Sequence, residues 1–299
     1  MDEKELIETS IKSLPLLHKG KVRDIYKIDE KYLLIVTTDR LSAFDVVMNE
    51  PIPLKGFVLT QMADFWFHKL SFVIKNHLSG ITPESVVANN EVAQVKDRAT
   101  VVHKLKALPV EAIVRGYLSG SGWKDYQKTQ SICGIKLPQD LKESAKLSEP
   151  IFTPSSKEAF GQHDENISYE ECETRIGKEI TSRIKEISIK LYQEASGFAV
   201  TKGIIIADTK FEFGLDEVNN LVLIDEILTP DSSRFWPLDQ YREGVPQPSF
   251  DKQFIRDWLE SIGWNKTPPP PSLPEDVIIK TSQKYLEAFK KLTGHDIKK

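Results

Sequence analysis

The first third of the chain alternates short apolar runs with polar turns. Two of its connections, Lys19-Gly20-Lys21 and Asp29-Glu30-Lys31, are too short for a crossover between parallel strands, so the runs beside them should form antiparallel strands. Strand-rich sequence returns between residues 92 and 115. The predicted strands of this part occupy residues 16–18, 22–28, 32–37, 101–105 and 110–114.

Helical periodicity, with apolar residues three and four positions apart, marks several longer segments. Gly197 and Gly263 are expected to end two of these helices, and Ser168 with Glu171 forms a capping box ahead of helical sequence. The polar stretch at residues 144–166 is interpreted as an ordered loop. The predicted helices occupy residues 57–75, 178–195, 251–262 and 274–292.

Two further apolar segments, residues 203–213 and 221–228, flank the turn-prone residues 216–220 and predict a strand pair. Strands followed by helices, rather than alternating with them, favour an α+β fold over a doubly wound sheet. Residues 268–271 are all proline, which indicates a stiff extended linker.

Composition narrows the possible functions. The chain has 299 residues, of which 40% are hydrophobic and 28% charged, and a net charge of −4, which argues against nucleic acid as a main partner. Cys133 and Cys172 lie far apart, so no disulfide framework or zinc site is expected. A reducing compartment suits such cysteines, and a cytoplasmic location is therefore predicted. The charged N-terminus does not resemble a signal peptide, and no apolar run approaches the roughly 18 residues of a membrane span.

The segment around residues 207–213 carries the most informative pattern. If it is a strand, Asp208, Lys210 and Glu212 share one face, while apolar residues share the other. Such a face is suited to the wall of a charged cleft. The alternative is a ladder of salt bridges on a solvated face.

The next predicted strand brings a second acid, Asp225, near Glu212 if the two strands form a hairpin. Two convergent carboxylates suit Mg²⁺, and Lys210 between them would neutralise phosphoryl oxygens. The pattern does not fix the hairpin register, so whether the acids face each other is left open. Asp231 and Arg234 follow; turn chemistry and a surface ion pair are the alternative explanation for them.

Other polar segments offer weaker signals. Gly20, Lys21 and Arg23 could cover a triphosphate, although no Walker A sequence is present and most such turns are simply exposed. Residues 38–45 place polar groups where a strand ends in a loop, and residues 115–122 combine an arginine with a Gly/Ser loop that could cradle phosphate. Turn chemistry and a flexible connector are the respective alternatives. His163 has no partner histidine, so a role in ordering its loop is favoured over metal binding.

Together these segments closely resemble the SAICAR synthetase family, the phosphoribosylaminoimidazole-succinocarboxamide synthases. The resemblance extends from about residue 18 to residue 260. Ser119 and Arg23 are small departures from the usual family pattern, and the C-terminal helices resemble the longer form of the family. The matching segments are GKVRDIY, TDRLSAFD, PVEAIVRGYLSGSGW, TPSSKEAFGQHDENIS, ADTKFEFG, LIDEILTPDSSRFW and SFDKQFIRDWL.

The resemblance implies two lobes with largely antiparallel sheets around an ATP cleft. Residues 1–113 would be a β-rich lobe that covers ATP, and residues 114–299 a larger lobe with the metal and substrate sites. The implied substrates are ATP, carboxyaminoimidazole ribonucleotide (CAIR) and L-aspartate, with Mg²⁺ as cofactor. The implied roles are ATP binding for Gly20, Lys21, Arg23 and Lys210; metal binding for Glu212 and Asp225; catalysis for Lys210 and Asp208; and substrate binding for Asp39, Ser42, Asp45, Arg115, Ser121, Asp231 and Arg234.

In such a reaction the carboxylate of CAIR must first be phosphorylated. The amine can then attack the carboxyl carbon and displace phosphate. A site rich in Lys, Arg and Asp, without an evident Ser–His or Cys–His pair, suits this chemistry. Asp208 or Asp39 is the proposed acceptor of the amine proton. A kinase is disfavoured because no HRDxxxxN loop occurs, and a regulatory module without catalysis is disfavoured by the presence of Lys210, Glu212 and Asp225. The oligomeric state is not predicted.

Overall fold

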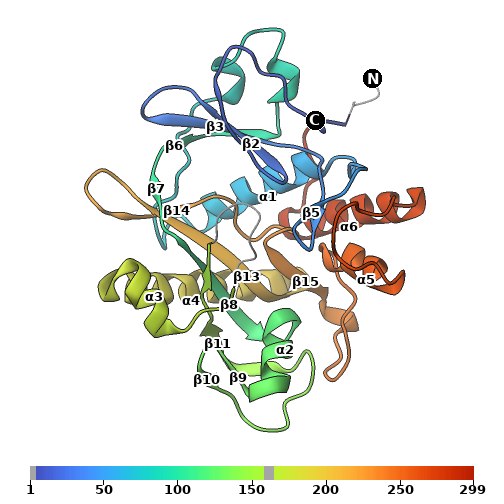
Figure 1. The fold of residues 1–299 in the computed structure, drawn as a ribbon. Helices are drawn as coiled ribbons and strands as arrows, with labels where there is room; N and C mark the ends of the chain where they lie inside the picture. The colour runs from blue at the N-terminus through green and yellow to red at the C-terminus, as the bar shows by residue number, and fades with distance from the viewer. Residues whose placement is uncertain (1–4, 158–164) are drawn as a thin grey trace. The chain divides into compact units, whose positions relative to one another are not determined.

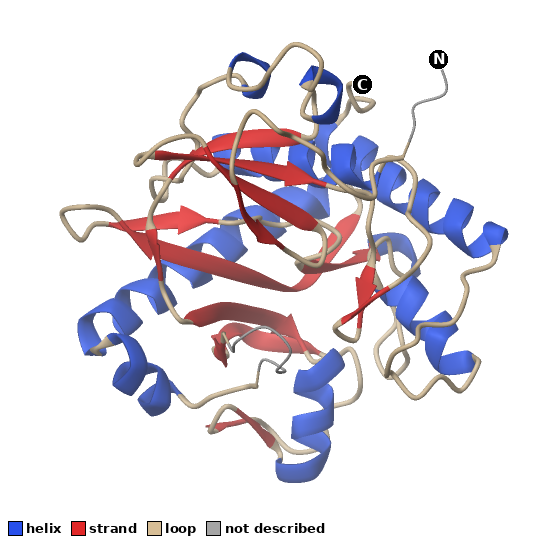
Figure 2. Ribbon diagram, turned by 45° about the horizontal axis from the view of Figure 1, so that its top comes forward, coloured by secondary structure: helices blue, strands red, loops and turns tan. Residues whose placement is uncertain are grey.

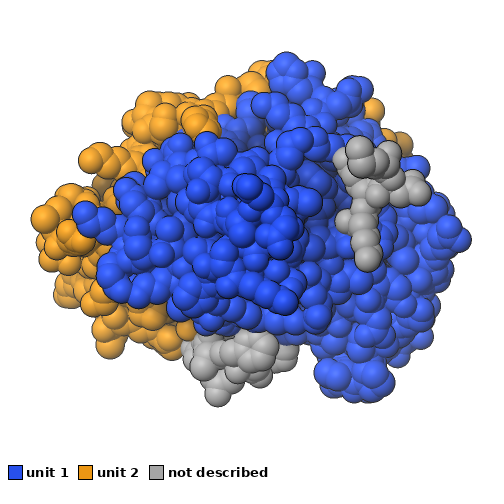
Figure 3. All heavy atoms as spheres, turned by 90° about the horizontal axis from the view of Figure 1, so that it is seen from above, with its two compact units in different colours: residues 1–67, 77–104, 250–299 blue, residues 68–76, 105–249 orange. Residues whose placement is uncertain are grey.

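The structure, a computed structural model, describes residues 5–157 and 165–299 (Figure 1). Helices and antiparallel strands both contribute, as Figure 2 shows, which confirms the α+β class. Contacts divide the chain into two compact units (Figure 3). Unit 1 consists of residues up to 67 together with residues 77–104 and 250–299, and unit 2 of residues 68–76 and 105–249.

Unit 1 is built on a four-stranded antiparallel sheet with the order β1-β2-β3-β6. The three strands predicted at its start are confirmed, because the short polar turns between them leave no room for a crossover. Its strands are β1 (Leu16–Lys19), β2 (Arg23–Lys27), β3 (Tyr32–Thr37) and β6 (Ala99–His103), with a small pair β4 (Ser42–Ala43) and β5 (Val46–Val47); its helices are α1 (Lys55–Lys69, whose last two residues belong to unit 2), η1 (Pro83–Ser85), η2 (Val92–Gln94), α5 (Gln253–Ser261) and α6 (Glu275–Thr293).

Among the described residues, two apolar clusters contribute to the core of unit 1. One lies beneath the sheet and includes Tyr26, Leu34 and Val101. The other joins the segment after β3 to the C-terminal part of the chain, with Leu41, Ile52, Ile255, Leu259, Leu273 and Val277 among its buried members. Ser282 on α6 also donates a hydrogen bond to the carbonyl of Pro53. The last fifty residues are therefore part of the core of unit 1.

Unit 2 contains a seven-stranded sheet in which the long strand β13 pairs with four neighbours. Helix α4 packs against β13 and β8, and Tyr192 on α4 donates to the carbonyl of Ile206 at 2.7 Å (Figure 1). The strands are β7 (Lys106–Ala107), β8 (Val110–Tyr117), β9 (Ser131–Ile132), β10 (Ile135–Lys136), β11 (Lys146–Phe152), β12 (Ser155–Ser156), β13 (Ile204–Leu215), β14 (Leu221–Ile224) and β15 (Ser233–Pro237); the helices are α2 (Gly120–Thr129), α3 (Tyr169–Ile176), α4 (Lys178–Thr201) and η3 (Leu238–Gln240).

Several predicted elements need correction. The segment at residues 144–166 is not simply a loop, because β11 and β12 within it both pair with β8. Helix α1 ends at Lys69 rather than near residue 75. The Gly/Ser segment after Arg115 leads into a helix at Gly120. Helix α4 continues through Gly197 and stops before Gly203, whose φ of 76° lies in the left-handed region that ends helices.

The predicted boundary at residue 113 falls inside β8, and α5 and α6, expected in the larger lobe, belong to unit 1. The functional division into an ATP lobe and a substrate lobe stays a prediction. Within residues 5–157 and 165–299, no helix combines the length and the apolar character needed to cross a membrane.

Candidate active site

Strand β13 carries the predicted acid–base–acid face near the middle of the unit 2 sheet. It pairs with β8 on one side, where Asp208 lies opposite Arg115, and with β14 on the other, where Glu212 lies opposite Ile224. The predicted hairpin between these two segments is confirmed. Asp208 and Glu212 are only 4% and 5% exposed, so the face is buried and the alternative of a solvated salt-bridge ladder is wrong.

The two predicted metal ligands converge on one ammonium group. The Nζ atom of Lys210 lies 2.5 Å from a carboxylate oxygen of Glu212 and 4.0 Å from a carboxylate oxygen of Asp225. Asp225 comes directly after the end of β14 and has a φ of 66°. Aspartate tolerates this left-handed conformation better than most residues, and here it ends the strand beside Glu212.

Sequence reasoning missed three residues of this cluster. Glu111 accepts a hydrogen bond from the Lys210 ammonium at 2.9 Å and another from the Ser155 hydroxyl at 3.0 Å. Lys157 forms a short ion pair with Glu212. A signal for Glu111 existed, because it shares strand parity, and hence a sheet face, with Arg115 in an otherwise apolar strand.

The carboxylates around Lys210 keep its side chain positively charged. Burial alone would lower its pKa, but the surrounding carboxylates, led by Glu212, outweigh that effect and raise the pKa well above its ordinary value. Lys210 is therefore protonated at neutral pH. It can stabilise negative charge on a phosphoryl group, but it cannot act as a base.

A second cluster on the same sheet joins two arginines through Asp208. A carboxylate oxygen of Asp208 accepts from Arg115 at 3.1 Å and from Arg234 at 2.6 Å. Arg115 also donates to the hydroxyls of Ser121 and Thr153, each at 3.0 Å. The predicted anion-binding residues Arg115, Ser121 and Arg234 are thus brought together, and Asp208 holds both guanidinium groups in place.

This arrangement disfavours Asp208 as the acceptor of the amine proton. Protonation would remove the negative charge that compensates Arg115 and Arg234 in a site with little solvent. Asp231 lies in the connection between β14 and β15, where its backbone N–H donates to the Thr229 hydroxyl at 3.2 Å. It is half-buried and precedes Arg234 by three residues.

Two glycines let this cluster pack closely. A Cβ atom at Gly120 would lie 2.1 Å from the Arg234 guanidinium, and the φ of Gly120 is +56°. A Cβ atom at Gly116 would lie 1.9 Å from the hydroxyl of Tyr192. The segment after β8 therefore needs glycine for contact with Arg234 and with α4, in addition to any phosphate-binding role.

Three of the four predicted ATP residues, Gly20, Lys21 and Arg23, lie in unit 1 at the turn between β1 and β2, and the fourth, Lys210, lies on β13 in unit 2. The Gly20 N–H donates to the carbonyl of Arg23 at 2.8 Å and closes the turn, and Lys21 forms a short ion pair with Asp45. The buried guanidinium of Arg40, which the sequence did not single out, donates to the carbonyls of Gly20 at 2.9 Å and Lys21 at 3.1 Å. Arg40 thereby fixes the shape of the turn.

Asp39 does not present its carboxylate to a ligand. It is fully buried, one oxygen pairs with Arg98 at 2.9 Å, and the backbone N–H groups of Leu6 and Gly56 donate to the carboxylate at 2.8 Å. The predicted roles of Asp39 in substrate binding and proton transfer conflict with this geometry, which gives it a structural role. Ser42 is buried in β4.

Among the described residues, no group of three or more His, Cys, Asp or Glu side chains is arranged to hold a metal ion. Glu212 and Asp225 supply two carboxylates. That donor set fits Mg²⁺, which prefers oxygen ligands and commonly keeps positions for water and substrate phosphate. His163 lies outside the described residues.

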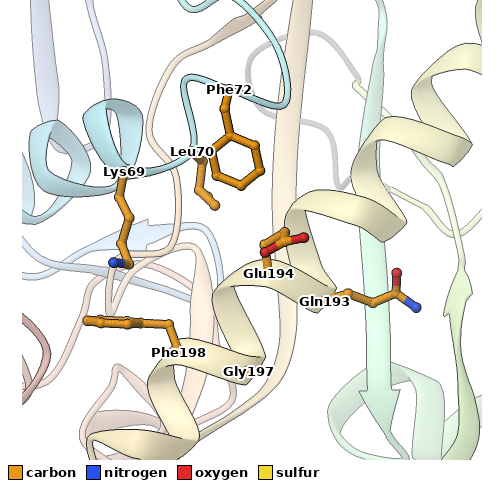
Figure 4. Close-up of a pocket in the computed structure, with 7 residues that line it drawn as sticks. All are labelled: Lys69, Leu70, Phe72, Gln193, Glu194, Gly197 and Phe198. Carbon is orange, nitrogen blue, oxygen red and sulfur yellow. The ribbon is translucent and has the colours of Figure 1, made fainter.

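Unit 2 also has a surface hollow of about 420 Å³. None of the predicted site residues contributes to it. The Lys69 ammonium lies 3.7 Å from the centre of the Phe198 ring at this hollow (Figure 4). The lining residues are Lys69, Leu70, Phe72, Gln193, Glu194, Gly197 and Phe198.

Comparisons with known proteins identify the family that the chain resembles. The family model of SAICAR synthetase matches residues 16–271. The chain is 62% identical over 294 residues to the phosphoribosylaminoimidazole-succinocarboxamide synthase of Cupriavidus metallidurans, covering 97% of each chain, and 62% identical over 289 residues to that of Nitrosomonas europaea, covering 96% of this chain and 98% of the other.

Solved structures give the same result. The SAICAR synthase from Saccharomyces cerevisiae complexed with SAICAR has a TM-score of 0.90 and 45% sequence identity, covering 98% of this chain and all of the other. A type-2 SAICAR synthetase in complex with ADP has a TM-score of 0.70 and 26% identity, covering 94% and 99% of the two chains.

Proposed function

The chain belongs to the SAICAR synthetase family, and from this premise we propose the part that each site residue plays in an ATP-dependent ligation. The reaction joins CAIR to L-aspartate and yields SAICAR, ADP and phosphate, in purine biosynthesis. The observation that carries the residue assignments is the convergence of Glu212, on β13, and Asp225, directly after β14, on the Lys210 ammonium.

We assign the ATP phosphates to the turn with Gly20, Lys21 and Arg23, in the β-rich lobe proposed for residues 1–113, and to Lys210. The backbone amides of the turn and its cations supply the donors that phosphate oxygens require. Glu212 and Asp225 would hold Mg²⁺, which would neutralise charge on the phosphates. Support comes from the carboxylate donor set and from the complex of a family member with ADP.

CAIR is assigned to the residues around Asp208, where Arg115, Ser121 and Arg234 form one hydrogen-bonded group. Two guanidinium groups fixed by a shared carboxylate suit a ligand that carries a phosphate and a carboxylate. Asp231, Ser42 and Asp45 complete the proposed substrate residues. Asp208 acts by orienting the two arginines.

The chemistry needs positioning and charge stabilisation more than proton transfer by a side chain. The carboxylate oxygen of CAIR attacks the γ-phosphorus of ATP, the bond to the bridging oxygen breaks, and ADP leaves. Lys210, protonated, stabilises the charge that spreads over the phosphoryl oxygens. The unprotonated amine of aspartate then attacks the carbonyl carbon of the acyl phosphate, the bond from that carbon to the phosphate oxygen breaks, and an amide forms as inorganic phosphate leaves and takes up the proton that the amine nitrogen loses.

The test is phosphate release by the purified protein with ATP, CAIR and L-aspartate. All three substrates should be required, whereas a kinase would need no aspartate. Glu212→Ala and Asp225→Ala should each remain folded and lose at least about 100-fold in kcat, the loss typical of removing one group that stabilises a transition state. Activity within tenfold of the wild type for both variants would exclude the metal assignment.

The location proposed is the cytoplasm. Both cysteines, Cys133 and Cys172, are free thiols in this structure, which suits a reducing compartment.

A further inference from the structure

Both carboxylate oxygens of Glu212 are already taken by ammonium groups. Lys210 donates to one oxygen at 2.5 Å, and Lys157 donates to the other in a short ion pair. Glu212 is 5% exposed, so these ion pairs are only weakly screened by water. A divalent cation on Glu212 would lie next to two ammonium groups that repel it, so its binding is favoured when at least one of them moves away.

The cluster also contains a second carboxylate, Glu111, that can bind an ammonium group displaced from Glu212. Glu111 is 8% exposed and already accepts from Lys210 at 2.9 Å through one oxygen. Its other oxygen accepts from the Ser155 hydroxyl at 3.0 Å, and Ser155 lies opposite Glu111 in the pairing of β12 with β8. Glu111 is thus held beside Lys210 by two hydrogen bonds, one through each carboxylate oxygen.

The charge balance of the cluster supports an exchange. Within residues 5–157 and 165–299, the ion pairs of Lys157 and Lys210 join three carboxylates to two ammonium groups, which leaves one net negative charge. Adding a divalent cation would make the cluster positive, unless an ammonium group moves away or phosphate arrives. Lys157 has a side chain 41% exposed, against 25% for Lys210, so Lys157 has the easier route into solvent.

We propose that Lys157 and Lys210 occupy Glu212 until the cation binds, and that Glu111 then keeps Lys210 beside the reacting phosphate. Glu111 is a positioning residue that acts through Lys210, and Lys157 is a competitor of the cation. This inference rests on the proposed metal role of Glu212 and Asp225. It adds that cation affinity is set by the exchange of ion pairs within the cluster.

The first measurement is Mn²⁺ binding to the intact protein, followed by the electron paramagnetic resonance signal of free Mn²⁺, with and without ATP whose β,γ-bridging oxygen is replaced by methylene. Mn²⁺ is a suitable probe because it shares the oxygen-ligand preference of Mg²⁺. Lys157→Met should bind Mn²⁺ about tenfold more tightly than the wild type, because one competitor is removed. Lys136→Met, which changes an exposed lysine of β10, should match the wild type.

The second measurement separates positioning from the general effect of a negative charge. Glu111→Gln should weaken Mn²⁺ binding about tenfold in the wild-type protein but have no effect in a Lys210→Met background, because the two residues act as one unit. Glu149→Gln on β11, an exposed position, serves as the control. Glu111→Gln should also lower kcat more than it changes the KM for ATP.

The outcomes distinguish a failure of this inference from a failure of the proposed metal site on which it rests. If Glu212→Gln and Asp225→Asn leave Mn²⁺ binding unchanged, the metal assignment itself fails. If those two variants weaken Mn²⁺ binding, the metal site stands. The proposed exchange is then overturned by either of two results: Lys157→Met does not strengthen Mn²⁺ binding, or the effect of Glu111→Gln persists in the Lys210→Met background.

Discussion

Left-handed backbone conformations recur at residues that carry the proposed chemistry. Asp225 has a φ of 66°, Asp45 a φ of 65° and Gly120 a φ of 56°. Aspartate and glycine adopt this conformation with less strain than most residues, which lets the chain turn sharply while a functional group stays at the turn. At the residue scale, the sequence predicted the charged residues of the site. It also predicted the hairpin that brings Glu212 and Asp225 together. Glu111 was missed because its partner Lys210 lies 99 positions further along.

Gly120 should affect substrate binding more than stability. In Gly120→Ala, the new methyl group would displace the Arg234 guanidinium from Asp208, so the KM for CAIR should rise at least about tenfold. The left-handed backbone should add a stability loss of about 1 kcal/mol. Gly134→Ala is the matched control, because its φ is +82° but a Cβ atom there meets nothing within 4 Å. Equal KM values in the two variants would refute the proposed contact with Arg234.

His77 should make the stability of the protein depend on pH. Burial, with the positive charges of Arg23 and His103 nearby, lowers its pKa from 6.5 to about 3. The unfolded chain therefore binds a proton in the range where the folded chain does not, and stability falls as the pH falls below 6.5. Between pH 6.5 and pH 5 the loss from this group should be about 2 kcal/mol.

This dependence can be measured by urea unfolding at pH 7 and pH 5. His77→Gln should reduce the difference in unfolding free energy between the two pH values by about 2 kcal/mol. His295→Gln, at an exposed C-terminal position, should leave that difference unchanged. An unchanged difference in His77→Gln would mean that His77 is not kept neutral by burial.

At the scale of elements, local pattern predicted strands well and helix ends poorly. The strands β1 to β3 and the β13–β14 hairpin follow from short turns between apolar runs. Helix α4 runs past Gly197 because its final turn buries Ala199 completely, which offsets the roughly 1 kcal/mol penalty of a glycine in a helix. Strands β11 and β12 could not be found locally, since both depend on pairing with β8.

The turn between β1 and β2 depends on Arg40 for its shape. Arg40→Met would release the carbonyls of Gly20 and Lys21 and leave the buried Asp24 without its ion pair. The KM for ATP should rise about tenfold, and stability should fall by about 3–5 kcal/mol. Arg40→Lys keeps the charge but can reach fewer acceptors, so intermediate values are expected.

Arg98→Met separates these two effects, because it breaks another buried ion pair of unit 1, with Asp39, while the hydrogen bonds from Arg40 to the turn stay in place. It should lose comparable stability without the change in KM. Steady-state kinetics at a temperature where all variants are folded provides the comparison. A similar increase in KM for Arg98→Met would indicate a general loss of stability rather than a specific role of Arg40.

At the scale of the whole molecule, unit 1 is assembled from three separate stretches of chain. The apolar stripes of α5 and α6 predicted two helices, but a stripe does not reveal its partner. The contacts of Leu273 and Ile255 with the cluster around Leu41 and Ile52 therefore lay beyond sequence reasoning. For the same reason these helices were expected in the other lobe.

Leu273 should report on this assembly. Leu273→Ala should lower the free energy of unfolding by about 2–4 kcal/mol, because a 4% exposed side chain is removed from the cluster. Ile279→Ala, on the same C-terminal segment but 45% exposed, should change it by less than about 0.5 kcal/mol. Urea unfolding followed by tryptophan fluorescence gives both values, and equal losses would show that the cluster does not depend on Leu273.

The division of unit 1 has a consequence for how the protein is made. Every stretch of unit 2 lies before residue 250, so all of that unit is translated before residues 250–299. The first sheet is made earlier still, but its unit lacks Ile255, Leu273 and Val277 until those residues have been translated. Chains truncated after residue 249 should therefore hold a protease-resistant second unit beside a digestible N-terminal region, and chaperones would meet the exposed apolar surface of that region.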